Sequence, residues 1–175
     1  MITMKNQELT EIFRDVGRRY GFTDVTATFA PLTDLKAEWS RSYVWAEFRI
    51  SDYLSEISPE AMRDMAIATF EKIANGYRPE YGEDFKKEVF TDAFRERWRP
   101  LYIKRAGLKT KIKDPPKMDI PDVLFYRGRR PAEWSIVFRV ITLPSRMTDE
   151  EKEDLLTRFR EAYQEFSERT APKED

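Results

Sequence analysis

Apolar residues recur at helical spacing near the start of the chain and at strand spacing soon afterwards. Within residues 6–19 the apolar positions lie three or four apart, at Leu9, Ile12, Phe13 and Val16, which is typical of the buried face of a helix. Gly21 follows as a stop signal. From Thr23 to Phe29 the spacing changes to two, which predicts a half-buried strand. Two further alternating runs, at 35–39 and 43–51, flank a polar tract and predict a hairpin.

The middle of the chain carries clear helix boundaries. Ser58 and Pro59 predict a helix start. A Ser side chain can accept hydrogen bonds from first-turn amides. Pro has no amide hydrogen, but an amide at the first helical position has no partner within the helix, so nothing is lost there. The pair Asn75-Gly76 predicts its left-handed end. A second helix is expected from Asp84 to Trp98, bent or ended near Pro100, with 101–108 as a candidate continuation.

Prolines and a capping signal organise the last third. Residues 109–121 contain three prolines among lysines and predict an exposed connector, since proline cannot donate to a central strand or a helix interior. Strands are expected at 123–127 and 134–142, joined as a second hairpin through Gly128 to Pro131. Thr148 and Glu151 have the spacing of a capping box that begins the last helix.

These elements predict one α+β domain over residues 1–170, followed by a frayed tail at 171–175. We expect a mostly antiparallel sheet of about five strands covered by helices. A chain of 175 residues suits a single domain and can bury a sizeable core.

Composition excludes several kinds of chemistry. The chain has no histidine and no cysteine, which removes Ser-His-Asp triads, thiolate nucleophiles, disulfides and zinc sites built on either residue. No glycine-rich phosphate loop or calcium loop is present. Lys and Arg number 31 against 32 Asp and Glu, so any charge-driven binding depends on local asymmetry. We therefore expect no metal, no cofactor and a non-catalytic protein.

No signal peptide or long apolar run appears in the sequence. We expect a cytoplasmic protein that does not enter a membrane.

The run 43–51 offers a candidate binding surface. Its even positions are apolar, so the odd side chains face the other side of the sheet: Tyr43, Trp45, Glu47 and Arg49. In one interpretation a helix or the second hairpin covers these aromatic residues, and the charges pair across strands at the rim. In the other, the aromatic residues form the apolar wall of a site for a protein or small-molecule partner, and Glu47 and Arg49 are its polar groups.

The order of elements adds a family resemblance over residues 20–168. The phrase "FRISDYL", followed by the helix "SPEAMRDMAIATFEKIANG", a second helix that ends in "YIKR", a hairpin and a closing helix, resembles the small SprT-like, minigluzincin-type zinc metallopeptidases. The resemblance places a His-Glu-x-x-His motif on the closing helix, where this chain reads "DLLTRFREAYQEF". It therefore implies a scaffold that has lost peptidase chemistry and serves binding.

A second candidate surface is the basic stretch 97–117, which contains a single acidic residue, Asp114. Its cations are Arg97, Arg99, Lys104, Arg105, Lys109, Lys111, Lys113 and Lys117. Arg127, Arg129 and Arg130 extend it. In one interpretation these side chains contact phosphates, while Trp98 and Tyr102 stack on nucleic-acid bases. In the other, both aromatic residues pack inward and the lysines solvate a loop.

Two weaker possibilities remain open. The carboxylates Glu38, Glu47, Asp52 and Glu133 lie on or beside the expected strands, which permits a carboxylate- or Mg-dependent enzyme. The last helix starts with a cluster of acidic residues, which suits the helix dipole and also permits head-to-tail association of copies through the basic stretch.

Overall fold

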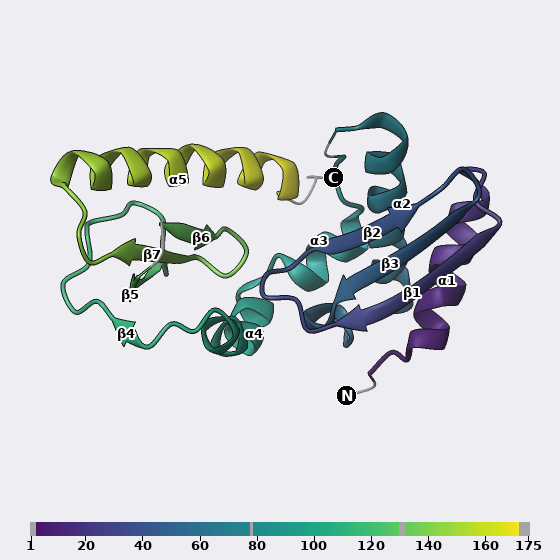
Figure 1. The fold of residues 1–175 in the computed structure, drawn as a ribbon, viewed down its shortest axis with the longest axis horizontal. Helices are drawn as coiled ribbons and strands as arrows, with labels where there is room; N and C mark the ends of the chain where they lie inside the picture. The colour runs from purple at the N-terminus through teal and green to yellow at the C-terminus, as the bar shows by residue number, and fades with distance from the viewer. Residues whose placement is uncertain (1–2, 78, 130–131, 172–175) are drawn as a thin grey trace. The chain divides into compact units, whose positions relative to one another are not determined.

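The computed structural model describes residues 3–77, 79–129 and 132–171, which form two compact units. The N-terminal unit holds the chain up to residue 94 and the end of the chain from residue 170. The C-terminal unit holds residues 95–169. Figure 1 shows the elements of both units in chain order.

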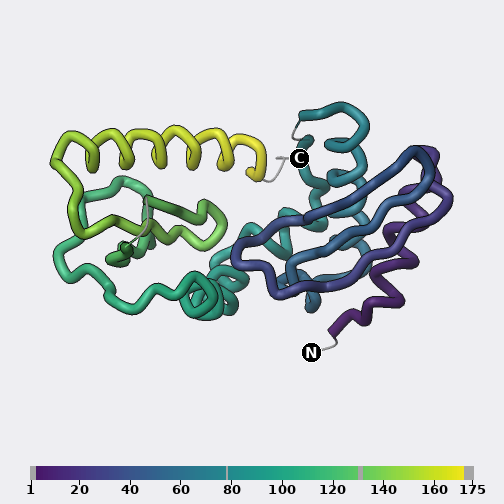
Figure 2. The backbone as a smooth tube through the Cα atoms, viewed as in Figure 1, coloured from purple at the N-terminus to yellow at the C-terminus, as the bar shows by residue number. Residues whose placement is uncertain are grey.

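The N-terminal unit contains a mixed sheet of three strands. Its elements are α1 (Asn6–Arg18), β1 (Asp24–Ala30), β2 (Ala37–Arg41), β3 (Trp45–Ser51), η1 (Asp52–Leu54), α2 (Pro59–Asn75) and α3 (Glu83–Val89). The strand order is β1-β3-β2, with β3 parallel to β1 and antiparallel to β2 (Figure 2). The first helix, the first strand, the first hairpin and the helix from Pro59 are therefore confirmed.

Aromatic side chains fill the core of this unit. Phe13 of α1, Phe48 of β3 and Phe70 of α2 are fully buried. The rings of Phe13 and Phe48 lie 4.9 Å apart, and those of Phe48 and Phe70 lie 5.1 Å apart. Both helices thus pack on the face of the sheet that carries Phe48.

Helices α2 and α3 cap each other. The Ser58 hydroxyl accepts from the Ala61 amide at 3.1 Å, as the sequence predicts. Glu88 of α3 accepts from the Ser58 amide at 2.8 Å. In return, Asp64 of α2 accepts from the Phe85 amide, in the first turn of α3, at 3.2 Å. Two helix starts are therefore satisfied by side chains from the neighbouring helix.

The prediction of one helix over 84–98 is wrong. The helix stops after Val89, because Phe90 adopts φ −90° and ψ 56°, outside the helical region. A new helix, α4 (Asp92–Arg105), follows. The hydroxyl of Thr91 accepts from the Phe94 amide at 3.1 Å and caps its start. The continuation beyond Pro100 is helical through Arg105.

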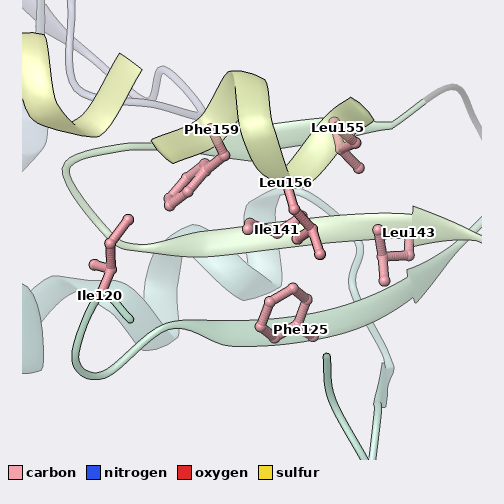
Figure 3. Close-up of a cluster of buried hydrophobic side chains, with 7 residues drawn as sticks. All are labelled: Ile120, Phe125, Ile141, Leu143, Leu155, Leu156 and Phe159. Carbon is pink, nitrogen blue, oxygen red and sulfur yellow. The ribbon is translucent and has the colours of Figure 1, made fainter. Parts of the chain in front are cut away.

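The C-terminal unit contains α4 from Arg95 onward and a second mixed sheet of four strands. Its other elements are β4 (Thr110–Lys111), β5 (Leu124–Gly128), β6 (Glu133–Ser135), β7 (Val140–Pro144) and α5 (Asp149–Thr170). The strand order is β4-β5-β7-β6. Helix α5 packs on one face through a cluster of buried residues drawn in Figure 3: Ile120, Phe125, Ile141, Leu143, Leu155, Leu156 and Phe159.

The second predicted hairpin is wrong. The expected strand 134–142 is interrupted at 136–139, where Arg139 adopts a left-handed φ of 52° and the Ser135 hydroxyl accepts from the Phe138 amide at 3.1 Å. The hairpin therefore joins β6 to β7, whereas β5 pairs with β7 in parallel. The predicted turn from Gly128 reaches residues 130 and 131, which lie outside the described residues.

The α+β class is confirmed, but the strands form two mixed sheets, each with one parallel pair, instead of one sheet of about five strands. The helices α2, α3 and α4 lie between the strand groups in the chain. The connector 109–121 also differs from expectation, since Thr110 and Lys111 form the short edge strand β4. Of the predicted tail, residues 172–175 lie outside the described residues. No helix in the described ranges has the length and apolarity needed to cross a membrane.

Candidate functional site

One face of the N-terminal sheet is exposed to solvent, and we call it the open face. It carries the side chains that alternate with the core set: Asp24, Thr26, Thr28, Glu38, Ser40, Trp45, Glu47 and Arg49. All of them are exposed except Glu38, which is half-buried. Trp45 retains 38% of its surface. The face is therefore open, as the binding interpretation requires.

The strand register arranges these side chains in rows across the sheet. Thr28, Arg49 and Glu38 form one row. Thr26, Glu47 and Ser40 form the next. The strands β1 and β2 thus contribute side chains that the sequence interpretation, centred on residues 43–49 alone, did not include.

Tyr43 lies elsewhere than predicted, because β3 begins at Trp45. Tyr43 sits in the turn before it and is 93% exposed. In that turn, the Ser42 amide donates to the Trp45 carbonyl at 2.9 Å. Val44, expected in the core, is 52% exposed. Its carbonyl accepts from the Thr23 amide, just before β1, at 2.9 Å. We call Tyr43, Val44 and Trp45 the hairpin tip, an exposed apolar group beside the open face.

Charges on the open face pair locally. Arg49 contacts Glu38 at 2.8 Å, and Lys36 contacts the other oxygen of the same carboxylate at 3.2 Å. The Arg49–Glu38 pair joins β3 to the neighbouring strand β2, as the interpretation with cross-strand charge pairs expects. The face offers a mixed-charge surface with an aromatic side chain at one end.

The four candidate carboxylates do not form one site. Glu38 is engaged by two cations, whereas Glu133 belongs to the other unit. In the part of the chain that the structure describes, no group of three or more Asp and Glu side chains is placed to hold a metal ion. The arrangement gives no support to the carboxylate- or Mg-dependent alternative.

The start of the basic stretch is built into the C-terminal fold. Arg99 donates to Asp122 at 3.0 Å, and Arg95 donates to the other oxygen of that carboxylate at 3.1 Å. Their side chains are only 12% and 8% exposed. The hydrogen bond from Arg99 lowers the pKa of Asp122, and burial opposes this effect. Arg99 therefore holds the fold together and does not face solvent as a phosphate ligand.

The aromatic residues of this stretch are also engaged. Tyr102 is buried and stacks on Phe138 at 5.2 Å. The Arg97 guanidinium lies 4.3 Å from the centre of the Trp98 ring. Tyr102 therefore follows the interpretation in which the aromatic residues pack inward, because its ring faces the core.

The rest of the stretch is a run of exposed lysines, which we call the lysine strip, that starts in the last turn of α4 and passes through the edge strand β4. Lys104, Lys109, Lys111, Lys113 and Lys117 are exposed and make no ion pair within the described residues. Arg105 is half-buried. Pairing of β4 with β5 puts Lys111 beside Tyr126 on one face and Arg127 on the opposite one. Arg129 is exposed, and Arg130 lies outside the described residues.

Comparison with known proteins returns no relative. The chain matches no protein-family model, no curated protein and no solved structure.

Proposed function

We propose that the protein is a non-catalytic binding module that holds a protein partner against the open face of its N-terminal sheet. One observation carries the proposal: the hairpin tip exposes Tyr43, Val44 and Trp45 together, directly beside the polar rows of that face. These are three of the four large hydrophobic residues that are exposed in the described chain. A group of exposed apolar residues bordered by polar side chains is typical of protein interaction sites.

The chemistry of the surface supports a protein partner. Aromatic and arginine side chains dominate the energetics of protein interfaces, and Trp45 and Arg49 lie on the same strand face. The ion pair of Arg49 with Glu38 is 59% and 39% exposed at its two side chains, so it contributes little to folding. The resemblance to SprT-like peptidases stays a prediction, and it fits a scaffold that binds without cleaving because the chain lacks histidine.

The test is cross-linking and pull-down with the purified protein and a Tyr43→Ala/Trp45→Ala variant. Tyr77→Ala is the matched control, because Tyr77 is another aromatic residue of the same unit and is 60% exposed. We expect the wild type and the control to retain the same protein, and the double variant to lose it while its thermal unfolding is unchanged. Equal retention by all three proteins would exclude the open face as the site.

The lysine strip supports a second candidate, binding of nucleic acid. Its five lysines are exposed and carry no ion pair within the described ranges, which leaves them available to phosphates. We expect binding to a short oligonucleotide at low salt, a steep fall in affinity with salt, and loss on changing Lys109, Lys111 and Lys113 to Glu. A Lys5→Glu/Arg19→Glu/Lys87→Glu variant controls for net charge, since it reverses the same number of cations and all three are exposed in the other unit. Absence of binding at low salt excludes this candidate.

A further inference from the structure

The two edge strands of the N-terminal sheet differ in whether their outward backbone groups have hydrogen-bond partners. Those of β1 have partners, so we call β1 the closed edge. Polar side chains one turn apart on α1 satisfy the outward backbone groups of β1. Asn6 accepts from the Phe29 amide at 2.9 Å. The Thr10 hydroxyl accepts from the Ala27 amide at 3.0 Å and donates to the Ala27 carbonyl at 2.9 Å. Figure 1 shows α1 running beside this strand. No other strand can pair here without displacing these side chains.

The opposite edge, β2, is free. The Lys36 carbonyl accepts from the Ser51 amide at 3.1 Å, and the Ser42 amide donates to Trp45 at 2.9 Å, so the even residues of β2 pair with β3. In an antiparallel ladder the alternate residues then direct both backbone groups away from the partner. Ala37, Trp39 and Arg41 therefore present their amides and carbonyls outward, and the described residues provide no hydrogen-bond partner for them.

We propose that an extended segment of a partner protein adds to the sheet at β2, with acidic side chains on the face shared by Trp39. The inference rests on the proposed function, because it specifies how a protein partner engages the N-terminal sheet. In such strand addition the main-chain hydrogen bonds supply affinity and alternate side chains supply specificity. Three outward residues give an incoming strand both donors and acceptors in register.

Charge on that face selects acidic side chains. The Lys72 ammonium, from α2, lies 5.6 Å from the centre of the Trp39 ring. The Arg41 guanidinium lies 5.3 Å from the ring of Phe22. Both cations are exposed, and neither pairs with a carboxylate in the described part of the chain. Side chains of an added strand that point to this face lie within reach of both cations.

The same charges disfavour a second copy of this chain as the occupant. A two-fold pairing of β2 with β2, centred on Trp39, would align every outward residue with an outward residue. It would also bring Lys72 and Arg41 of both copies to one seam, where like charges repel. On the other face of β2, Glu38 is already neutralised by Lys36 and Arg49. An acidic strand meets no such conflict.

The experiment uses the full chain and two short capped peptides, one alternating Val with Glu and one alternating Val with Lys. Binding is followed by titration at low salt and by the hydrogen exchange of the Ala37, Trp39 and Arg41 amides. We expect the Val-Glu peptide to bind, the Val-Lys peptide to bind at least about tenfold more weakly, and the three amides to become protected. No binding of the Val-Glu peptide at millimolar concentration overturns the inference.

Two matched variants isolate the edge. Ala37→Pro removes an outward amide that the ladder with β3 does not use, and proline is tolerated at such an edge position. Ala37→Val keeps the amide and is the control. We expect Ala37→Pro to weaken binding of the Val-Glu peptide by about tenfold or more, and Ala37→Val to leave it unchanged. Equal affinities for the two variants overturn the inference.

Charge reversal tests the selectivity separately. The Arg41→Glu/Lys72→Glu variant is expected to prefer the Val-Lys peptide, and an unchanged preference for Val-Glu overturns the acidic assignment. Self-association that Ala37→Pro abolishes, without binding of either peptide, overturns it in favour of a second copy. None of these failures affects the open-face proposal, because that proposal is decided by the Tyr43/Trp45 and Tyr77 variants.

Discussion

The two units build the same three-strand arrangement and use it differently. In the N-terminal unit the order is β1-β3-β2, and in the C-terminal unit three strands follow as β5-β7-β6. In each, the first strand lies parallel to the third, and the second forms a hairpin with the third. The two sheets differ in how their faces are covered. This difference is visible in the burial pattern of one internal strand of each sheet, β3 and β7.

The central strand β3 alternates between exposed and buried residues from Trp45 to Ile50, whereas β7 is buried from Val140 to Leu143. Alternation marks a sheet with one solvated face, and a continuous buried run marks a sheet covered on both faces. The sequences, "WAEFRIS" and "VITLP", already carry this contrast. Among the described strands, β3 therefore belongs to a sheet with one solvated face, whereas β7 is buried on both sides.

The largest expected effect breaks the C-terminal unit alone. Asp122→Ala removes the carboxylate that joins Arg95 and Arg99, whose side chains are almost completely buried. We expect the C-terminal unit to lose about 3 kcal/mol of its free energy of unfolding, because two nearly buried guanidinium groups lose a charged acceptor, although Asp122 itself is 40% exposed. Hydrogen exchange of the β5 and β7 amides measures this loss, because two units need not unfold together.

Asp122→Asn separates charge from backbone conformation. Asp122 has a left-handed φ of 58°, which Asn also tolerates. A similar loss of stability with Asn assigns the effect to charge. A nearly neutral Asn variant would assign it to features that Asn keeps, which are the left-handed backbone and one accepting oxygen. Because the arginines lower the pKa of Asp122 in the folded protein, its ionic stabilisation is complete above the unfolded pKa of about 3.9. The difference from Asp122→Asn should vanish as the pH falls through the lower, folded value.

A smaller effect in the same unit tests how tightly β5 and β7 approach. A methyl group added at Gly128 would lie 2.3 Å from the Thr142 side-chain methyl carbon, and Thr142 is buried. We expect Gly128→Ala to cost about 2 kcal/mol through overpacking, again read from exchange of the β7 amides. Adding Thr142→Ser removes the opposing methyl and should restore most of the loss. A double variant as unstable as Gly128→Ala would contradict this explanation.

Elements whose ends are marked by local chemistry could be predicted from the sequence. The helix from Pro59 begins at the Ser58 cap and ends at Gly76 with φ 73°. Both end signals could be recognised in the sequence, because each acts on backbone groups only a few residues away. The alternation in β3 likewise identified the side chains that face away from the core, but it did not decide whether another element covers that face. Its partners on β1 and β2 were missed, because the register depends on which strands pair.

Strand pairing in the second half could not be read from the sequence. Consecutive strands are usually neighbours, which led to the wrong hairpin between 123–127 and 134–142. The observed pairing is accompanied by long-range contacts that the sequence does not reveal: Arg99 donates to the Asp122 carbonyl at 2.9 Å, and Arg139 donates to the Pro121 carbonyl at 3.0 Å. The same contacts explain why Arg99, predicted at a binding surface, belongs to the fold.

A prediction in the N-terminal unit concerns its closed edge. Thr10→Val keeps the shape of the side chain but removes both hydrogen bonds to Ala27. We expect a loss of about 1.5 kcal/mol, since an amide and a carbonyl lose their partner, with faster exchange at Ala27. Thr10→Ser keeps the hydroxyl and should cost less. A larger loss with Thr10→Ser than with Thr10→Val would show that the methyl group, and not the hydrogen bonds, matters.

The smallest expected effect lies on the open face and sharpens the contrast between the units. Arg49→Ala breaks an ion pair whose two side chains are 59% and 39% exposed, so we expect a change of no more than about 0.5 kcal/mol in thermal unfolding. A loss of several kcal/mol would mean that the open face supports the fold as the Asp122 cluster does. With stability unchanged, reduced retention of a protein partner by Arg49→Ala would report on binding alone. The substitution therefore separates the two roles of arginine in this chain, one that joins buried segments at Asp122 and one available to a partner on the open face.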